Sequence, residues 1–385
     1  MKVLILSCNT GEGHNSCAKA LKIEMDRQGI ECEVADTLAL VNETLSRRVS
    51  EAYVFSTKGP VFEHAYKLGG MVSDLQGSLI KSPVYNTNKL YAKRLYDYIV
   101  EGKFDAVVCV HLFPAEALTS LHRKAKLMVP TFFVMTDYTC IPFLAETELD
   151  HYIIPHEHLI EEFVEKGLKR EKLVPIGIPI DEAKFTQSIT REQARQRVAE
   201  EFGWRLDEVE GNWYLIMSGS MGFGNLGDLV NELLLQCETN DRILCVCGNN
   251  EKMRYSLQDS FGGEKPLKII GFTDKVALLM DASDVIFTKP GGITSTEAAV
   301  KHIPLIHTAP IPGLENFNAR FFHYHNMSYH TNDVQQQVIV AKRLCNDEAY
   351  RLKMIDAQCK NTNPKTSQLV VELVRNVSNA QVKKN

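Results

Sequence analysis

The pattern that most constrains the fold opens the chain: a short apolar run, a glycine-bearing turn and a helical repeat follow one another. Val3–Leu6 is apolar and predicts a buried strand, and Thr10–Gly13 carries two glycines. Apolar residues then recur at helical spacing over Asn15–Gln28, and Cys32–Ala35 is predicted as a second strand that ends at Asp36. A strand–helix–strand unit of this kind predicts parallel strands joined by a right-handed crossover.

The same pattern starts again in the second half of the chain. An apolar run at Trp213–Met217 precedes a glycine-rich turn at Ser218–Gly224, and a helical repeat covers Leu226–Gln236. Further strands are predicted at Ala106–Val110, Thr131–Met135, Tyr152–Ile154, Leu173–Ile176, Ile243–Val246, Lys268–Ile270, Val285–Phe287 and Leu305–His307. This alternation predicts an α/β protein of two Rossmann-like, doubly wound domains that face a cleft, with ligands bound beyond the carboxyl ends of the strands.

The boundary between the domains is predicted within Ile176–Phe185, where a glycine and a proline follow a strand. We expect an N-terminal domain over residues 1–180 and a C-terminal domain over residues 181–365. A helix at about 366–385 is expected to pack back on the first domain. With 385 residues, of which 44% are hydrophobic and 24% charged, each half has enough apolar residues to bury a core.

Charge and hydropathy argue against two classes of protein. The formal net charge is −5, whereas a nucleic-acid-binding protein usually presents a basic surface. No stretch approaches the roughly 18 apolar residues of a membrane-spanning helix, and the N-terminus lacks the pattern of a signal peptide. We therefore expect a cytoplasmic protein without a nucleic-acid partner, able to bind peripherally at the inner face of the cell membrane.

His14 is the first candidate catalytic residue. It follows Gly13 where the first glycine-bearing turn meets the helix, a place where backbone amides can approach a phosphate. A titratable ring at this position can act as a general base or as a phosphate contact. Capping of the helix by His14 is an equally good alternative.

A second, more specific motif follows the strand predicted near residue 285. Gly291 and Gly292 expose consecutive amides to an anion, and the hydroxyls of Thr294 and Ser295 add donors. Glu297, expected in the first helical turn, can accept hydrogen bonds from ribose hydroxyls, as the acidic residue of a dinucleotide site does. Alternatively, Glu297 only favours the helix N-terminus electrostatically.

Two further segments are expected on the same rim of the second domain. Gly219 and Ser220 lie in the glycine-rich turn after the first strand of that domain. Glu315 and Asn318 are three residues apart, share a predicted helix face and can bond sugar hydroxyls. For this second pair, capping of the helix is the alternative.

Three segments together resemble a known family: the Gly-Glu-Gly-His turn at residues 11–14, the stretch GFTDKVALLMDASDVIFTKPGGITSTEA and the segment PGLENFNA. They look like the monogalactosyldiacylglycerol synthase and bacterial diacylglycerol glucosyltransferase group, which shares its donor-binding pattern with the peptidoglycan glucosaminyltransferases. The resemblance extends from residue 1 to about residue 340. It implies the GT-B fold and inverting transfer of a hexose from a UDP-sugar.

By position, the resemblance also implies roles for single residues. It places Gly271 and Phe272 at the uracil, Gly291, Gly292 and Thr294 near the diphosphate, Glu297 at the ribose, and Glu315 and Asn318 facing the hexose. Two regions depart from the family pattern. Leu314 replaces the usual Gln, and Tyr138, Ile141 and Leu144 stand where a His and a Trp are usual near the acceptor. The hexose and the acceptor are therefore less well defined than the nucleotide.

Two chemical requirements follow from the expected reaction. Fixed amides and helix N-termini can stabilise the charge that develops on the departing diphosphate. No two aspartates lie two residues apart, so the Asp-x-Asp metal motif is absent and we expect neither a catalytic metal nor another cofactor. The acceptor hydroxyl needs a base, for which His14 and Asp137 are the candidates. A turn or capping role is the alternative for Asp137.

The segment Phe55–Val100 mixes basic and aromatic residues, which suits an anionic membrane surface. The spacing of Tyr91, Leu95 and Tyr98 also fits an ordinary packed helix. The leading hypothesis is hexose transfer from a UDP-sugar to a diacylglycerol-like lipid acceptor. A UDP-sugar 2-epimerase and a non-catalytic nucleotide-sugar-binding protein are the alternatives.

Overall fold

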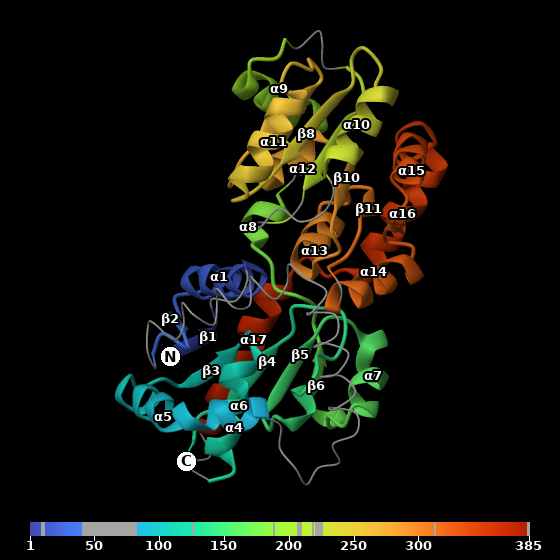
Figure 1. The fold of residues 1–385 in the computed structure, drawn as a ribbon. Helices are drawn as coiled ribbons and strands as arrows, with labels where there is room; N and C mark the ends of the chain where they lie inside the picture. The colour runs from blue at the N-terminus through green and yellow to red at the C-terminus, as the bar shows by residue number, and fades with distance from the viewer. Residues whose placement is uncertain are drawn as a thin grey trace. The chain divides into compact units, whose positions relative to one another are not determined.

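The computed structural model describes residues 1–8, 12–40, 83–124, 127–187, 189–205, 210–217, 219, 226–311 and 313–382. The chain divides into two compact units. The first consists mainly of Met1–Glu182 and Lys365–Asn385, and the second of Ala183–Ile311 and Glu315–Pro364. The chain therefore leaves the first unit, builds the second and returns to the first with its last helix (Figure 1).

The first unit contains a six-stranded parallel sheet in the order β2-β1-β3-β4-β5-β6. Its strands are β1 (Lys2–Ser7), β2 (Glu31–Asp36), β3 (Ala106–Cys109), β4 (Thr131–Val134), β5 (His151–Ile154) and β6 (Leu173–Pro175). Strands of a parallel sheet that is covered on both faces are continuous apolar runs, and β3 and β4 are accordingly buried at every position. The chain runs outward from β1 to β2 and then returns to the other side of β1 for β3, so the strand order reverses between β1 and β3.

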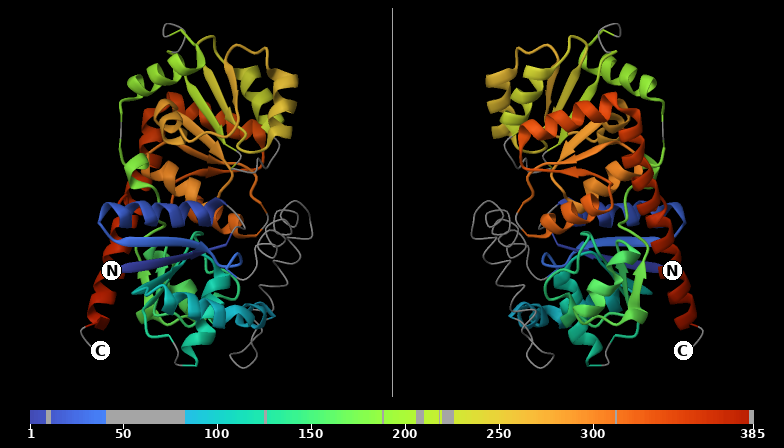
Figure 2. Two further views of the ribbon diagram at one scale, coloured as in Figure 1. Left: turned by 90° about the vertical axis from the view of Figure 1, so that its left-hand side faces the viewer. Right: turned by 90° about the vertical axis from the view of Figure 1, so that its right-hand side faces the viewer.

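Helices cover both faces of this sheet (Figure 2). They are α1 (Glu12–Arg27), α4 (Pro83–Asn88), α5 (Ala92–Glu101), α6 (Leu112–His122), α7 (Ile160–Glu165) and α17 (Thr366–Val382), with short 3₁₀ turns η1 (Lys89–Tyr91), η2 (Leu144–Glu146), η3 (Glu157–Leu159) and η4 (Arg170–Lys172). Helix α17 packs against α1, and Arg375 donates a hydrogen bond to Gln28 at the end of α1. Gly29, with a φ of 69°, follows α1 as the cap expected after a helix.

The second unit repeats the design, with a six-stranded parallel sheet in the order β12-β11-β10-β7-β8-β9. Its strands are β7 (Trp213–Met217), β8 (Arg242–Val246), β9 (Leu267–Ile270), β10 (Val285–Thr288), β11 (Leu305–His307) and β12 (Tyr329–His330). Its helices are α9 (Arg191–Phe202), α10 (Leu226–Gln236), α11 (Glu251–Phe261), α12 (Val276–Ala282), α13 (Gly292–Val300), α14 (Leu314–Tyr324), α15 (Val334–Asn346) and α16 (Glu348–Asn361), and α8 (Glu182–Phe185) leads into the unit. Here the strand order reverses between β7 and β10. The predicted fold class is confirmed: each half is a doubly wound α/β sheet.

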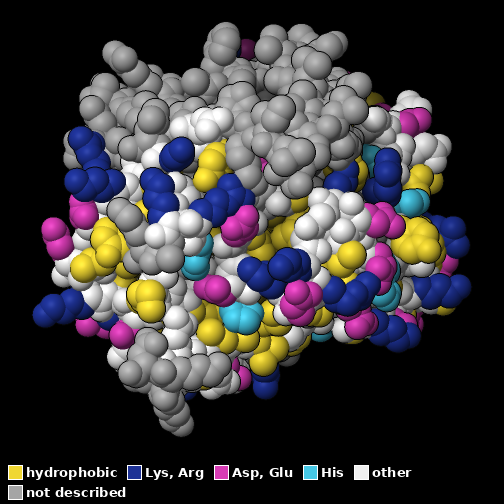
Figure 3. Space-filling model, turned by 90° about the horizontal axis from the view of Figure 1, so that it is seen from below, with side chains coloured by type: hydrophobic (Ala, Val, Ile, Leu, Met, Phe, Trp, Pro, Cys, Tyr) yellow, Lys and Arg dark blue, Asp and Glu magenta, His cyan; other side chains and the backbone are white. Residues whose placement is uncertain are grey.

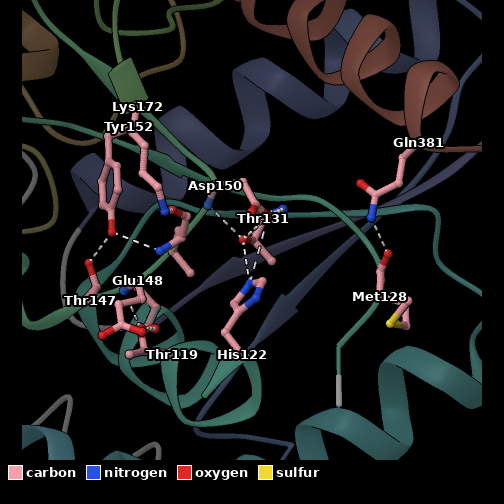
Figure 4. Close-up of polar contacts among 12 residues, drawn as sticks. Thr119, His122, Met128, Thr131, Thr147, Glu148, Asp150, Tyr152, Lys172 and Gln381 are labelled. Atoms are coloured by element: carbon pink, nitrogen blue, oxygen red, sulfur yellow. Dashed lines mark hydrogen bonds and ion pairs between the residues drawn. The ribbon is translucent and has the colours of Figure 1, made fainter. Parts of the chain in front are cut away.

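Polar side chains tie the amino ends of β4 and β5 together (Figure 4). Thr131 Oγ1 donates a hydrogen bond to Asp150 Oδ2 at 2.8 Å, and His122 Nε2 lies 2.9 Å from the same hydroxyl. Gln381 of α17 donates from Nε2 to the carbonyl of Met128 at 2.6 Å, which anchors the last helix at this end of the sheet. These contacts hold secondary structure together, and the candidate functional residues of this unit lie at the opposite, carboxyl ends of the strands.

The described part of Phe55–Val100, the segment rich in basic and aromatic residues, packs like an ordinary amphipathic pair of helices. Tyr85 and Tyr91 are buried, and the Tyr91 hydroxyl donates to a backbone carbonyl of α6 at 2.9 Å. Lys89 and Lys93 are exposed on the same stretch; its residues 55–82 lie outside the described part. Basic and acidic side chains lie next to one another on the face seen in Figure 3. Within the described ranges, no helix has both the length and the apolar character needed to cross a bilayer.

Candidate functional site

In the first unit, residues that follow three neighbouring strands meet where the strand order reverses. His14 follows β1, Val110 and His111 follow β3, and Thr136 and Asp137 follow β4. Ligands of open parallel sheets bind at this position because the helices that follow the strands diverge there. The structure thus brings both candidate catalytic residues, His14 and Asp137, to one switch point.

Helix α1 begins three residues earlier than its apolar pattern predicts. Gly13 and His14 therefore lie inside its first turn rather than in the turn that precedes it. The His14 Nδ1 atom lies 2.6 Å from the carbonyl oxygen of Val110. Because a carbonyl only accepts, Nδ1 carries the proton, and the neutral ring keeps its lone pair on Nε2. Through Nδ1 the ring is fixed to the neighbouring strand.

A threonine hydroxyl joins the two candidate catalytic residues. Thr136 Oγ1 lies 3.3 Å from His14 Nδ1 and donates to Asp137 Oδ2 at 3.3 Å. Burial lowers the pKa of His14 below its ordinary value, while the charge of Asp137 and the bond to Val110 act in the opposite direction. His14 is therefore neutral near pH 7, the state that a general base requires.

A second histidine, which was not predicted from the sequence, lies against His14. The rings of His111 and His14 meet edge to face with 4.8 Å between their centroids. His111 caps α6, its Nδ1 accepting from the amide of Phe113 at 3.2 Å. Burial and the nearby His14 lower the pKa of His111 well below its ordinary value. His111 could have been selected from the sequence because it directly follows a predicted strand. Asp137 was selected for the same reason.

The segment after Asp137 is held by a glutamate from α7. Glu162 Oε1 accepts from the Thr139 hydroxyl at 2.5 Å and from the amide of Cys140 at 2.8 Å. Tyr138 and Leu144, two of the residues that depart from the family pattern, are buried. The segment after Asp137 is therefore held against α7 by two hydrogen bonds and by buried side chains.

In the second unit, Gly219, which follows β7, lies beside Lys289, which follows β10, at the corresponding reversal. Gly219 has a φ of 72°, and a Cβ atom there would lie 2.6 Å from Cε of Lys289, the residue after β10. A Cβ at Gly291 would lie 3.5 Å from Lys289 Nζ. Gly219 thus leaves room for the lysine side chain, whereas a Cβ atom at Gly291 would make only an ordinary contact with it. Ser220, also predicted here, lies outside the described residues.

Helix α13 starts at Gly292, with Gly291 as its N-terminal cap. The sequence predicted Glu297 in the first turn of this helix, but it lies in the second turn. Because the effect of the helix dipole fades beyond the first turn, the purely electrostatic alternative for Glu297 loses its basis. Thr294 and Glu297 are both partly exposed.

Ser295 is not available to a ligand, contrary to the expectation that its hydroxyl adds a donor. It is fully buried and its Oγ lies 2.9 Å from His307 Nε2. The other ring nitrogen of His307 lies 3.1 Å from Ser328 Oγ. Burial lowers the pKa of His307 to about 3, so a neutral histidine links α13 to β11 and to the residue before β12.

The two residues predicted to face the hexose are both engaged within the second unit. Lys289 Nζ forms an ion pair with Glu315 Oε1, and the amide of Ile311 donates to Glu315 Oε2 at 2.7 Å. Asn318 is fully buried and donates from Nδ2 to the carbonyl of Pro290 at 3.0 Å. These bonds fix the loop before α13 on the first turns of α14.

The residues predicted to meet the uracil lie at the end of β9, at one edge of the sheet. Gly271 follows this strand, and a Cβ atom there would lie 3.4 Å from Cδ of Arg254 in α11. The next residue, Phe272, is 68% exposed. An exposed aromatic ring can stack on a flat ligand ring.

Family comparison adds to this geometry. Residues 14–180 match the model of monogalactosyldiacylglycerol (MGDG) synthase, and residues 214–365 match the glycosyltransferase family 28 C-terminal domain. The chain therefore combines an MGDG synthase domain with a glycosyltransferase family 28 C-terminal domain. The MGDG synthase match begins at His14, and the C-terminal match contains Lys289, Glu297 and Glu315.

Curated relatives of this glycosyltransferase share its length. A protein of Bacillus pumilus (strain SAFR-032), named processive diacylglycerol beta-glucosyltransferase, is 27% identical over 384 residues, covering 96% of this chain and 94% of that protein. The protein of the same name from Bacillus subtilis (strain 168) is 29% identical over 326 residues, covering 83% and 81%.

Solved structures show the fold of this glycosyltransferase at lower identity. MurG of Acinetobacter baumannii matches with a TM-score of 0.65 and 14% identity, covering 97% of this chain and 99% of that one. A UDP-GlcNAc 2-epimerase of Neisseria meningitidis, solved with UDP-GlcNAc, matches with a TM-score of 0.62 and 14% identity, covering 98% and 100%. The GT-B fold is therefore confirmed.

Proposed function

We propose that this glycosyltransferase moves a hexose, with inversion, from a UDP-sugar to a diacylglycerol-like lipid. The observation that carries the proposal is the hydrogen bond from His14 Nδ1 to the Val110 carbonyl at 2.6 Å. It leaves Nε2 of a neutral ring as the proton acceptor at the switch point of the first sheet. In a single displacement, Nε2 takes the proton of the acceptor hydroxyl as its oxygen bonds to the anomeric carbon and the bond to the diphosphate breaks.

Thr136 and Asp137 support the base in this proposal. The imidazolium that forms during the reaction carries its other proton on Nδ1, close to Thr136 Oγ1 and in the field of Asp137. A nearby carboxylate favours the charged ring and so assists the proton transfer. In this scheme Asp137 stabilises the protonated base, and His14 is the base itself.

The donor is proposed to bind to the second unit. The amides of Gly291 and Gly292 at the start of α13 would stabilise the charge on the departing diphosphate. Thr294 lies in the same turn, and Glu297 would accept hydrogen bonds from the ribose. Gly271 and Phe272 would hold the uracil. HepE of Anabaena, whose fold matches this chain with a TM-score of 0.58, was solved in complex with UDP and glucose, which supports a donor of this class.

The acceptor and the location of the enzyme are proposed from its relatives and its surface. The relatives in Bacillus are named for transfer to diacylglycerol. Lys89, Lys93 and Arg94 are exposed on and beside α5 and can contact anionic lipid head groups. We propose peripheral binding at the cytoplasmic face of the membrane. Flotation with anionic and with neutral vesicles tests this, and equal failure on both would favour a soluble acceptor.

The direct test of function is product analysis. The enzyme is incubated with vesicles that contain diacylglycerol and with UDP-glucose or UDP-galactose, and lipid extracts are examined by mass spectrometry. We expect a hexosyl-diacylglycerol from at least one donor, and nuclear magnetic resonance of the product should show a β linkage. Absence of glycolipid with every donor, together with no binding of UDP in titration calorimetry, would reject the proposal.

A UDP-sugar 2-epimerase is the second candidate, because epimerases match the fold with TM-scores of 0.61 and 0.62. The two activities differ in their need for an acceptor. Epimerisation of a UDP-sugar with no lipid present, followed by nuclear magnetic resonance, would favour the epimerase.

A further inference from the structure

Lys289 lies beside described residues that follow two other strands of the second unit. It directly follows β10, its side chain lies against Gly219 from the loop after β7, and it forms an ion pair with Glu315 in the first turn of α14, which follows β11. These three strands are neighbours in the sheet. The ammonium group is thus located at the carboxyl edge of the sheet, beside the start of α13.

The side chain of Lys289 lies beside two glycines and keeps part of its surface exposed. Gly219 and Gly291 lack the Cβ atoms that would contact its side chain, at 2.6 Å from Cε and 3.5 Å from Nζ. The lysine side chain is 20% exposed and that of Glu315 12% exposed. An ammonium group has three donors, and Glu315 engages one of them with Oε1. The remaining donors can reach a ligand at the N-terminus of α13.

Both oxygens of Glu315 accept a bond from the protein. Oε1 pairs with Lys289, and Oε2 accepts from the amide of Ile311 at 2.7 Å. A carboxylate in this state holds a cation in a fixed direction. Each oxygen keeps a further lone pair, but the side chain is only 12% exposed, which leaves little room for a hexose hydroxyl.

We propose that Lys289 is a diphosphate-binding residue of the donor site and that Glu315 is its positioning residue, rather than a ligand of the hexose. This rests on the proposed UDP-sugar donor. A lysine binds phosphate as a compact point charge, and the adjacent amides of α13 provide directed donors to the same anion. Glu315 limits the motion of the long side chain, so less conformational entropy is lost when the nucleotide binds.

The first experiment separates the charge of Lys289 from recognition of the base. UDP and uridine are titrated against the wild type and Lys289→Met, which keeps the chain length and removes the charge. UDP affinity should fall about 10- to 100-fold, as expected for a lost charge-assisted contact, while uridine affinity should change less than about threefold. Lys289→Arg should keep most of the UDP affinity. The control Lys360→Met removes an equal charge from the exposed pair with Asp356 on α16 and should change neither affinity.

Two outcomes of that titration contradict the inference in different ways. Binding of UDP by the wild type together with unchanged UDP affinity in Lys289→Met would overturn the role of Lys289 and leave the donor proposal intact. Failure of the wild type to bind any uridine nucleotide would overturn both. Thermal unfolding of each variant identifies a loss of folding, and the retained uridine affinity of Lys289→Met shows that the base site is intact.

The second experiment addresses Glu315. The ratio of UDP-glucose to UDP affinity, and likewise of UDP-galactose to UDP, is measured for the wild type, Glu315→Gln and Glu315→Ala. If Glu315 positions Lys289, the affinities for UDP and for each UDP-sugar change in the same proportion, and each ratio stays constant. The salt dependence of UDP binding should also change in Glu315→Ala, because the lysine is less well held. A ratio that falls severalfold in Glu315→Gln would show direct contact with the hexose and reject the assignment.

Discussion

Among single residues, His14 has a proton position fixed by the chain itself. Its Nδ1 proton is held by the Val110 carbonyl, so only Nε2 can act as the base. We expect His14→Ala to lower kcat about 10²- to 10⁴-fold, the range for loss of general base catalysis, with UDP affinity within a few-fold of wild type. Steady-state kinetics and calorimetry measure the two effects. His158→Ala, an exposed histidine of the same unit, is the control and should retain full activity.

The pH profile provides an independent check on the same residue. A base works in its neutral form, and burial lowers the pKa of His14 below 6.5. The rate constant kcat/KM should therefore remain constant from neutral pH downward and decline only below about pH 6.5. An acidic limb centred above pH 7 would assign the base to another group.

His307 predicts a pH dependence of stability rather than of activity. Its pKa is about 3 in the folded chain and about 6.5 when unfolded. Between these values the unfolded chain binds a proton that the folded chain does not, so the free energy of unfolding falls as the pH is lowered. One such group contributes about 1.4 kcal/mol per pH unit below pH 6.5. Urea unfolding from pH 7.5 to 5 should show a shallower decline in His307→Asn than in wild type; parallel slopes would contradict the assignment.

Among elements, the segment after β4 depends on α7 for its direction. Glu162 holds this segment by accepting hydrogen bonds from the Thr139 hydroxyl and the Cys140 amide. We expect Glu162→Ala to lower kcat about tenfold or more, because a small displacement of Asp137 weakens catalysis, while UDP affinity is unchanged. Glu161→Ala is the matched control, since Glu161 is an exposed neighbour paired with Arg170. Equal losses in both variants would indicate a general effect on α7.

Strands were more predictable than helix starts. All eleven predicted strands are present with bounds within one residue. Most are short, buried apolar runs between turn residues; β2, with one buried residue in six, was predicted from its place after the first helix. The two-residue strand β12 was missed because Tyr329–His330 carries no apolar run. Helix α1 begins before its apolar repeat, and polar first turns of this kind hide where a helix starts.

Candidate site residues were predicted from their place in the strand–turn–helix pattern or, for Gly271 and Phe272, from the family resemblance. His14, Gly291 and Asp137 follow strands and were selected for that reason. Thr136 and Lys289 gain their significance from contacts with residues 122 and 26 positions away, His14 and Glu315. A single sequence does not display such contacts, because the approach of distant segments is determined by packing.

In the whole molecule, the chain passes twice between its units, and both passages are tied together in the first unit. Residues 176–182 lead out of it, and Thr366 at the start of α17 marks the return. Thr366 Oγ1 donates to the Ile178 carbonyl at 3.0 Å, and Ser367 Oγ donates to the Ile180 carbonyl at 2.7 Å. Gly177, with a φ of 120°, is close enough to Thr366 that a Cβ atom would lie 2.5 Å from its Cγ2 atom.

This close approach predicts that Gly177→Ala destabilises the protein through two separable terms. Backbone strain at positive φ costs about 1–3 kcal/mol, and the overlap with Thr366 adds about 1–3 kcal/mol more. Gly167→Ala isolates the first term, because Gly167 has a φ of 107° and its added Cβ would meet only Ala145, at 3.7 Å. Adding Thr366→Ser to Gly177→Ala removes the clashing methyl and keeps the hydroxyl bond to Ile178. In urea unfolding, Gly177→Ala should have the lowest free energy of unfolding, and Gly167→Ala and the double variant should lie closer to wild type. A double variant that is no more stable than Gly177→Ala would show that the overlap with Thr366 contributes nothing.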